Sequence, residues 1–184
     1  MPRSAAAPRL SVDDWIDAGL ALLAEEGPSG VKIDRLCVRL GVTKGSFYWH
    51  FSDLAGFLAA VADRWGASRD ERREVFAELE ALAPRDRLSR MLDQFTDPRE
   101  WALERAVREW ARTDASVSER VEESDRWVFR AVRKVFLDLG FDAGDADARA
   151  KMLFYTGVGF IYVGRQGQRG GRRQRERMLD VLTG

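Results

Sequence analysis

Residues 41–51 read GVTKGSFYWHF, and this stretch decides how the first part of the chain folds. Just before it, residues 33–40 place apolar side chains three and four positions apart, which is the spacing of an amphipathic helix. Gly41 can take the left-handed conformation that ends a helix, and Thr43 is a good N-cap for the next one. Two helices joined by residues 41–43 make a helix-turn-helix.

In the second of these helices Phe47 and Phe51 lie four positions apart, so both can face the core. The outward surface that remains is cationic and aromatic, and consists of Lys44, Gly45, Tyr48 and Trp49. Gly45 costs about 1 kcal/mol relative to Ala in a helix interior. Because it has no side chain, it would let the backbone come close to a DNA strand. This surface therefore predicts contact with nucleic acid.

The segment from about Ser11 to Leu58 contains the string T-K-G-S-F-Y-W-H-F and resembles the N-terminal domain of the TetR family of bacterial transcriptional regulators. The resemblance implies that Lys44 and Tyr48 contact phosphates and base edges of DNA. The other positions that it places near DNA are Arg39, Thr43, Gly45, Ser46, Trp49 and His50. It also implies an all-α fold, in which a three-helix helix-turn-helix DNA-binding domain (residues 1–52) precedes a larger helical domain for ligand binding and dimerisation (residues 53–184).

Two residues of this surface have a second interpretation, and the next segment departs from the family pattern. Trp49 can lie along the sugar-phosphate backbone or fold against the first helix, and His50 can contact DNA or pack beside its neighbours. Many family members carry Lys or Arg where this chain has Ser52-Asp53-Leu54. We expect Ser52 to cap the following helix and Asp53 to complement its positive end, which removes a cationic contact.

The charge of the chain is balanced overall but uneven locally. Thirty basic and thirty acidic residues argue against a protein that coats nucleic acid or membrane through bulk charge. Between residues 27 and 52, however, only Asp34 opposes four basic residues, a local net charge of +3; these are Lys32, Arg35, Arg39 and Lys44. Arg3 and Arg9 add positive charge before the first helix. A local basic face is what phosphate contacts require.

Helical spacing runs through the rest of the chain. The first helix is expected at residues 12–26, with Gly27 and Pro28 at its end. Beyond Ser52, proline and glycine separate further helices predicted over residues 53–82, 85–96, 98–113, 116–139, 145–164 and 172–183. This makes about nine helices in all, with the fourth as a lever between the two domains. Residues 152–163 are too few to span a membrane and are interpreted as a buried core helix.

The second domain is rich in aromatic residues, most of which are expected to be core. A cavity among the helices between residues 87 and 163 would suit a hydrophobic or planar small molecule. Its candidate lining residues are Trp101, Trp127, Phe154 and Tyr155. Gly157 and Gly159 allow a close helix approach, either at a dimer interface of the last two helices or within one subunit. We expect a homodimer, because one short recognition helix reads only a few base pairs.

Residues 165–184 contain six arginines against two acids, a net charge of +4. We interpret this run as a solvated loop leading into the last helix, with a second DNA contact as the less favoured alternative.

The sequence argues against an enzyme and against a cofactor. One histidine and one cysteine cannot supply a metal cluster, no Gly-rich phosphate loop follows a strand, and no nucleophile has an evident base beside it. Cys37 is the only cysteine, so it cannot form an internal disulfide, and the N-terminus lacks the apolar run of a secretory signal. We therefore expect a cytoplasmic protein with no membrane partner.

These patterns predict a DNA-binding transcriptional regulator, and the family resemblance implies that it is most simply a repressor. It would bind a pseudo-palindromic double-stranded DNA operator as a dimer and be released by a small apolar or aromatic effector. The alternative is a protein-interaction module derived from such a regulator, with weakened DNA binding. The departure at residues 52–54 keeps this alternative open, whereas the intact Lys44, Gly45 and Tyr48 argue against it.

Overall fold

The computed structural model describes residues 10–95, 98–163 and 172–184. These residues form nine α-helices and two short 3-10 helices with no strand, which confirms the all-α prediction. The α-helices are α1 (Val12–Glu26), α2 (Ile33–Leu40), α3 (Lys44–His50), α4 (Leu54–Glu78), α5 (Pro84–Phe95), α6 (Pro98–Trp110), α7 (Ala115–Asp138), α8 (Ala143–Val163) and α9 (Arg172–Thr183). The 3-10 helices are η1 (Pro28–Gly30) and η2 (Leu79–Ala81). Arg3, Arg9 and the arginines at 165 and 169 lie outside the described residues.

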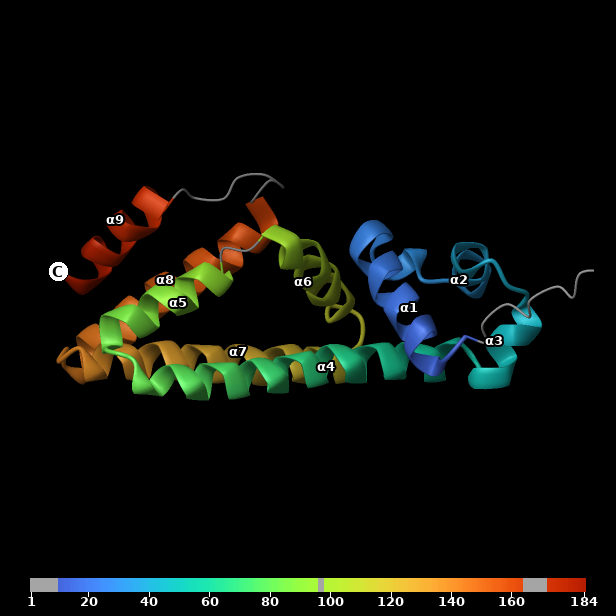
Figure 1. The fold of residues 1–184 in the computed structure, drawn as a ribbon, viewed down its shortest axis with the longest axis horizontal. Helices are drawn as coiled ribbons and strands as arrows, with labels where there is room; N and C mark the ends of the chain where they lie inside the picture. The colour runs from blue at the N-terminus through green and yellow to red at the C-terminus, as the bar shows by residue number, and fades with distance from the viewer. Residues whose placement is uncertain (1–9, 96–97, 164–171) are drawn as a thin grey trace, which may run out of the picture.

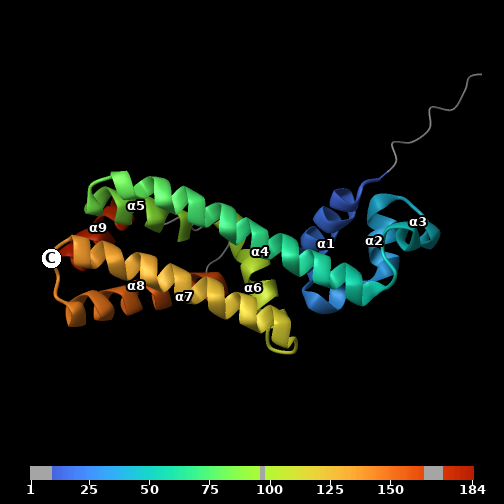
Figure 2. The same cartoon turned by 90° about the horizontal axis from the view of Figure 1, so that it is seen from below.

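The helices form an elongated molecule, with α1, α2 and α3 at one end and α9 at the other (Figure 1). The long helices α4 and α7 lie side by side along its length, as both views show (Figures 1 and 2). α6 packs against α1 on one side and against α7 and α8 on the other. Within the described residues no helix is both long and apolar enough to cross a bilayer.

The turn between α2 and α3 has the conformation that the sequence requires. Gly41 has φ 67° and ψ 33°, which is the left-handed region. Its N–H donates to the carbonyl oxygen of Val38 at 3.3 Å, and the N–H of Val42 donates to that of Cys37 at 3.0 Å. This pair of bonds is a Schellman motif, which satisfies the last carbonyl groups of α2. The predicted role of Gly41 as the residue that ends α2 is therefore confirmed.

Phe47 fixes α3 to the helices on either side of it. Its side chain is fully buried, and its ring lies 5.5 Å from that of Trp15 in α1 and 5.6 Å from that of Phe57 in α4, both edge to face. The ring of Phe51, four residues further along the chain, has its centroid 5.4 Å from that of Phe47. Edge-to-face pairs stabilise such a core beyond the burial of their area. Phe47 and Phe51 thus face the core, as predicted.

The first core continues past residue 52. It takes in the first half of α4, including Val61 and Trp65, and residues of α6 and α7 such as Val107 and Val121. A second core forms around Phe136 at the far end, from α4, α5, α7, α8 and α9. α4 contributes to both cores, so the boundary at residue 52 stays a prediction.

The expectation that residues 152–163 form a buried core helix is wrong. These residues lie in α8, but four of its large apolar side chains are at least half exposed: Met152, Tyr155, Tyr162 and Val163. Leu153 and Ala150 are buried against the second core. One face of α8 thus packs within the subunit while another remains open. Hydropathy alone cannot separate these two faces, because both are apolar.

Gly19 brings α1 and α4 together closely, and this contact can be tested. A Cβ atom at Gly19 would lie 2.6 Å from Cζ of Phe57 and 3.0 Å from Cγ2 of Val61, both in the core. We expect Gly19→Ala to lower the free energy of unfolding by about 1–3 kcal/mol, as overpacking does. Urea denaturation followed by circular dichroism measures this change.

Gly66→Ala is the matched control, because Gly66 also lies within a helix but its Cβ would meet only the end of the Arg120 side chain at 3.4 Å. It should leave stability unchanged or raise it by up to about 1 kcal/mol. Equal effects of the two substitutions would contradict close packing at Gly19.

Candidate nucleic-acid interface and ligand cavity

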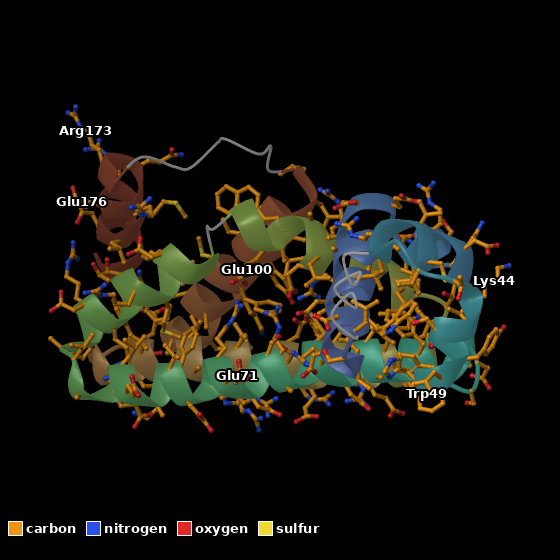
Figure 3. The ribbon with its side chains drawn as sticks, turned by 45° about the vertical axis from the view of Figure 1, so that its right-hand side comes forward. Lys44, Trp49, Glu71, Glu100, Arg173 and Glu176 are labelled. Carbon is orange, nitrogen blue, oxygen red and sulfur yellow. The ribbon has the colours of Figure 1, made fainter. Side chains whose placement is uncertain are left out.

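α3 presents an exposed face at one end of the molecule. Thr43, Lys44 and Gly45 are exposed, as are the side chains of Tyr48 (56%) and Trp49 (71%). Because Trp49 is so exposed, it does not belong to the core. The interpretation that placed Trp49 against the first helix is therefore wrong. Lys44 and Trp49 both project at the end of the molecule remote from α9 (Figure 3). These five residues form what we call the α3 face.

Two further predicted residues lie at the edge of the α3 face. His50 is half-buried, with its ring centroid 6.4 Å from that of Trp15, so its packing interpretation agrees with the structure. Ser46 is also half-buried, and its backbone N–H donates to the carbonyl oxygen of Thr43 at 3.0 Å. Thr43 occupies the N-cap position of α3, but its side chain makes no capping hydrogen bond.

The cations near the α3 face are paired with carboxylates. Nζ of Lys44 lies 2.6 Å from Oδ1 of Asp34, and this hydrogen bond raises the pKa of Lys44. Arg39 donates to both carboxylate oxygens of Glu25, at 2.7 Å and 2.9 Å. Arg35 forms an ion pair with Glu26.

The net charge of +3 for residues 27–52 therefore overstates the basic character of this end. Glu25 and Glu26, at the end of α1, belong to the same surface as α2. With them, four basic residues stand against three acidic ones, a net charge of +1. The range of residues 27–52 begins just after these two acids, whereas the fold places them beside the basic residues of α2.

The cap of α4 also differs from the expectation. Asp53, not Ser52, is the N-cap, and its Oδ1 accepts from the backbone N–H of Gly56 at 2.7 Å. A carboxylate at this position satisfies a free N–H group and interacts favourably with the helix dipole. The carboxylate of Asp53 thus caps the start of α4.

A cavity of about 80 Å³ lies among α4, α6, α7 and α8. Three of the four predicted lining residues meet there, Trp101, Trp127 and Phe154. Tyr155 does not line the cavity; it is 65% exposed on the open face of α8. On a helix, adjacent residues point about 100° apart, so Phe154 and Tyr155 cannot both face inwards.

The cavity is more highly charged than the sequence led us to expect. Its lining contains four arginines and three acidic residues: Arg69, Arg72, Arg73, Arg108, Glu100, Glu104 and Asp125. An apolar, aromatic lining was predicted, and that description covers only part of the wall. Helical spacing holds the signal that was missed, since positions 69, 72 and 73 share one face of α4 and positions 100, 104 and 108 share one face of α6.

Glu104 is the centre of the charged wall and is almost fully buried. It forms an ion pair with Arg69, and it accepts a hydrogen bond from Nε1 of Trp65 at 3.3 Å. Burial lowers the pKa of the Arg69 guanidinium. Arg108 donates to both oxygens of Asp125, at 2.8 Å and 2.6 Å. Every acidic residue of the lining thus has an arginine partner, because Glu100 pairs with Arg72.

Residues 16–67 match the family model described as bacterial regulatory proteins, tetR family. Among curated proteins, the HTH-type transcriptional regulator AcrR of Shigella flexneri is 31% identical over 74 residues, which are 40% of this chain. The matched part spans about a third of that relative's length, 33%.

Solved structures share the fold over nearly the whole chain. A transcriptional regulator from Rhodococcus sp. Rha1 is 21% identical with a TM-score of 0.72, and the match covers 95% of each chain. A protein from Saccharomonospora viridis, described as a transcriptional regulator in complex with choline, is 22% identical with a TM-score of 0.72 and covers 93% of this chain and 92% of its own. The matched residues contain α2, the turn at Gly41 and α3, so the helix-turn-helix part of the chain matches the tetR family of bacterial regulatory proteins.

Proposed function

We propose that the protein is a transcriptional repressor that binds a pseudo-palindromic double-stranded DNA operator as a homodimer and leaves it when a small molecule fills the cavity. The observation that carries the proposal is the exposed α3 face on a helix-turn-helix of the TetR family. Repression follows the habit of the family. Such a role would be carried out in the cytoplasm, where bacterial DNA lies.

The α3 face offers suitable chemistry for DNA contact. Lys44 would bind a phosphate, and Tyr48, one turn further along α3, would reach a phosphate or a base edge. A Cβ atom at Gly45 would lie no closer than 3.7 Å to another residue, so the fold itself does not require glycine there. Close approach to DNA explains this glycine. Thr43, Ser46 and Trp49 would extend the contact, and His50 would support it from behind.

The ion pairs near the α3 face would be in competition with DNA. Lys44 must leave Asp34 to reach a phosphate, and Arg39 must leave Glu25. These pairs are exposed, so each contributes at most about 1 kcal/mol and can exchange for a phosphate. Affinity would accordingly be moderate and sensitive to salt.

The open face of α8 supports the homodimer. Met152, Tyr155 and Tyr162 are exposed there, and Val181 of α9 is 71% exposed. Contiguous exposed apolar side chains mark an interaction surface. Gly159 fits this role, because a Cβ atom there would meet no described residue within 4 Å in the same subunit.

The cavity supports control by a small molecule. Two of the four helices that line it, α4 and α6, also pack against α1. A ligand can shift the molecule between two states only through a difference in its affinity for them. The Saccharomonospora viridis relative was solved with choline, which supports ligand binding by this fold.

Tyr48→Ala tests the DNA contact. We expect operator affinity to fall by about 1–3 kcal/mol, because a contact to a phosphate or base edge is lost while the exposed side chain leaves the core intact. Fluorescence anisotropy with duplexes that tile the DNA around the gene measures this change.

Val75→Ala, which removes an exposed apolar side chain far along α4, is the control and should bind DNA like the unaltered protein. Uniformly weak binding by both proteins would instead favour the interaction-module alternative.

Asp34→Asn tests the competition for Lys44. Removing this carboxylate frees Lys44 and lowers repulsion of the phosphates, so DNA affinity should rise about three- to tenfold at low salt. The gain should shrink as salt is added. Titrations at several salt concentrations measure it, and an unchanged or lower affinity would argue against a phosphate contact by Lys44.

Tyr155→Glu tests the dimer interface. A carboxylate buried without a partner in an interface is strongly unfavourable, so the variant should sediment as a monomer where the unaltered protein is a dimer. Leu137→Glu, on the exposed side of α7, is the control and should remain a dimer. A dimeric Tyr155→Glu protein would place the interface elsewhere.

A further inference from the structure

We propose that the small molecule that fills the cavity is a planar organic anion, in its simplest form an aromatic carboxylate, whose acid group is bound by Arg73. This inference rests on the ligand-binding role proposed above for the cavity, and names the class of ligand. It concerns the cavity and does not depend on whether the protein represses transcription.

Four arginines line the cavity, but only three of them pair with an acidic residue that also lines it. Glu100 is paired with Arg72, Glu104 with Arg69, and Asp125 with Arg108. Arg73 is the fourth arginine of the lining. Its carboxylate partners, Asp70 at 2.9 Å and Glu123 at 3.3 Å, do not line the cavity.

The partners of Arg73 are held only weakly. The side chains of Asp70 and Glu123 are 68% and 63% exposed, whereas that of Arg73 is 28% exposed. Exposed ion pairs are screened by solvent and contribute little. A ligand carboxylate inside the cavity would meet Arg73 in a drier place, where the bidentate contact of a guanidinium is stronger.

A second cavity shares Arg73 with the first and is also basic. It has a volume of about 200 Å³ and lies among α4, α5 and α7. Its lining includes Arg73, Arg87 and Lys134, with Glu80 as the only acid. Arg87 is 7% exposed, and its Nε atom is buried with no hydrogen-bond partner. Arg73 and Trp127 line both cavities, and basic residues outnumber acidic ones in each lining. Arg87 and Lys134 both form ion pairs with Asp138, which lines neither cavity.

The buried guanidinium groups argue against a cationic ligand. Nε of Arg69 and Nε of Arg108 are also buried without a hydrogen-bond partner, although Nε of Arg108 lies 3.9 Å from Oε2 of Glu104. With four arginines against three acidic residues, the lining of the first cavity has a net charge of +1. A cation would have to take a carboxylate from one of these arginines and leave a buried charge unpaired, which is costly. An anion requires no such exchange.

The aromatic part of the wall suits a planar ligand. Trp101, which lines the cavity, is stacked on Phe160, which does not, with ring centroids 5.9 Å apart and planes 6° from parallel. The guanidinium carbon of Arg73 lies 5.8 Å from the ring centroid of Trp127. A flat ring could therefore lie against an indole while its acid group meets Arg73. This arrangement combines the aromatic lining with the basic one.

The test compares three probes of nearly the same size and shape: benzoate, benzamide and benzamidinium, which carry negative, zero and positive charge. Isothermal titration calorimetry of the full-length protein without DNA measures their affinities at millimolar concentrations. We expect benzoate to bind at least about tenfold more tightly than either of the others, a difference of about 1.4 kcal/mol. Equal or tighter binding of benzamide or benzamidinium overturns the proposal, and so does the absence of benzoate binding.

Variants then locate the acid group. Arg73→Gln should remove the preference for benzoate, and Arg73→Lys, which keeps the charge but not the planar fork, should keep part of it. Arg120→Gln is the matched control, because Arg120 also joins α7 to α4, through Asp63, but lines neither cavity. Full benzoate affinity in Arg73→Gln, with circular dichroism unchanged, overturns the role of Arg73.

DNA binding is measured separately, so the two proposals can fail independently. Benzoate binding that depends on Arg73, in a protein that binds no operator, supports the anion site and contradicts the repressor. Operator binding together with a preference for benzamidinium supports the repressor and contradicts the anion site.

Discussion

The buried contact of Glu104 with Arg69 and Trp65 joins the two parts of the molecule. Removing one partner from a buried ion pair is destabilising by about 3–5 kcal/mol, because it leaves an uncompensated charge. Trp65 belongs to the core that holds the helix-turn-helix, and Arg69, one turn further along α4, lines the cavity. The guanidinium of Arg69 also lies 5.0 Å from the Trp65 ring centroid. One turn of α4 thus contributes both to the wall of the cavity and to the core against which α3 packs.

The local rules of the sequence were sufficient for the helices and their ends. Apolar spacing, Gly41 and the prolines placed the helices within a few residues, since these signals act over one or two turns. Phe47 could be assigned to the core because only one face of a seven-residue helix can be buried. These predictions needed no knowledge of which helices meet.

The predictions that failed depended on contacts between distant helices. Glu25 is 14 residues from Arg39 and Trp65 is 39 residues from Glu104, so spacing over one or two helical turns does not pair them. The same limit applies to the cavity, where three arginines of α4 meet acids of α6 and α7. The open face of α8 was missed for another reason: an apolar residue looks alike in the sequence whether it packs within one subunit or against a second copy.

The magnitudes decide which contact could carry a signal from the cavity to α3. An anion bound to Arg73 would compete with Glu123, and so weaken a link between α4 and α7. That link is exposed and contributes at most about 1 kcal/mol, whereas coupling between two sites in a regulator typically requires about 1–3 kcal/mol. The contact of Arg64 with Asp13, between α4 and α1, is exposed as well. The pair of Glu104 and Arg69 is buried and can hold this much free energy. Under the proposed function, a ligand that releases DNA would therefore act on this pair or on the indole of Trp65 beside it.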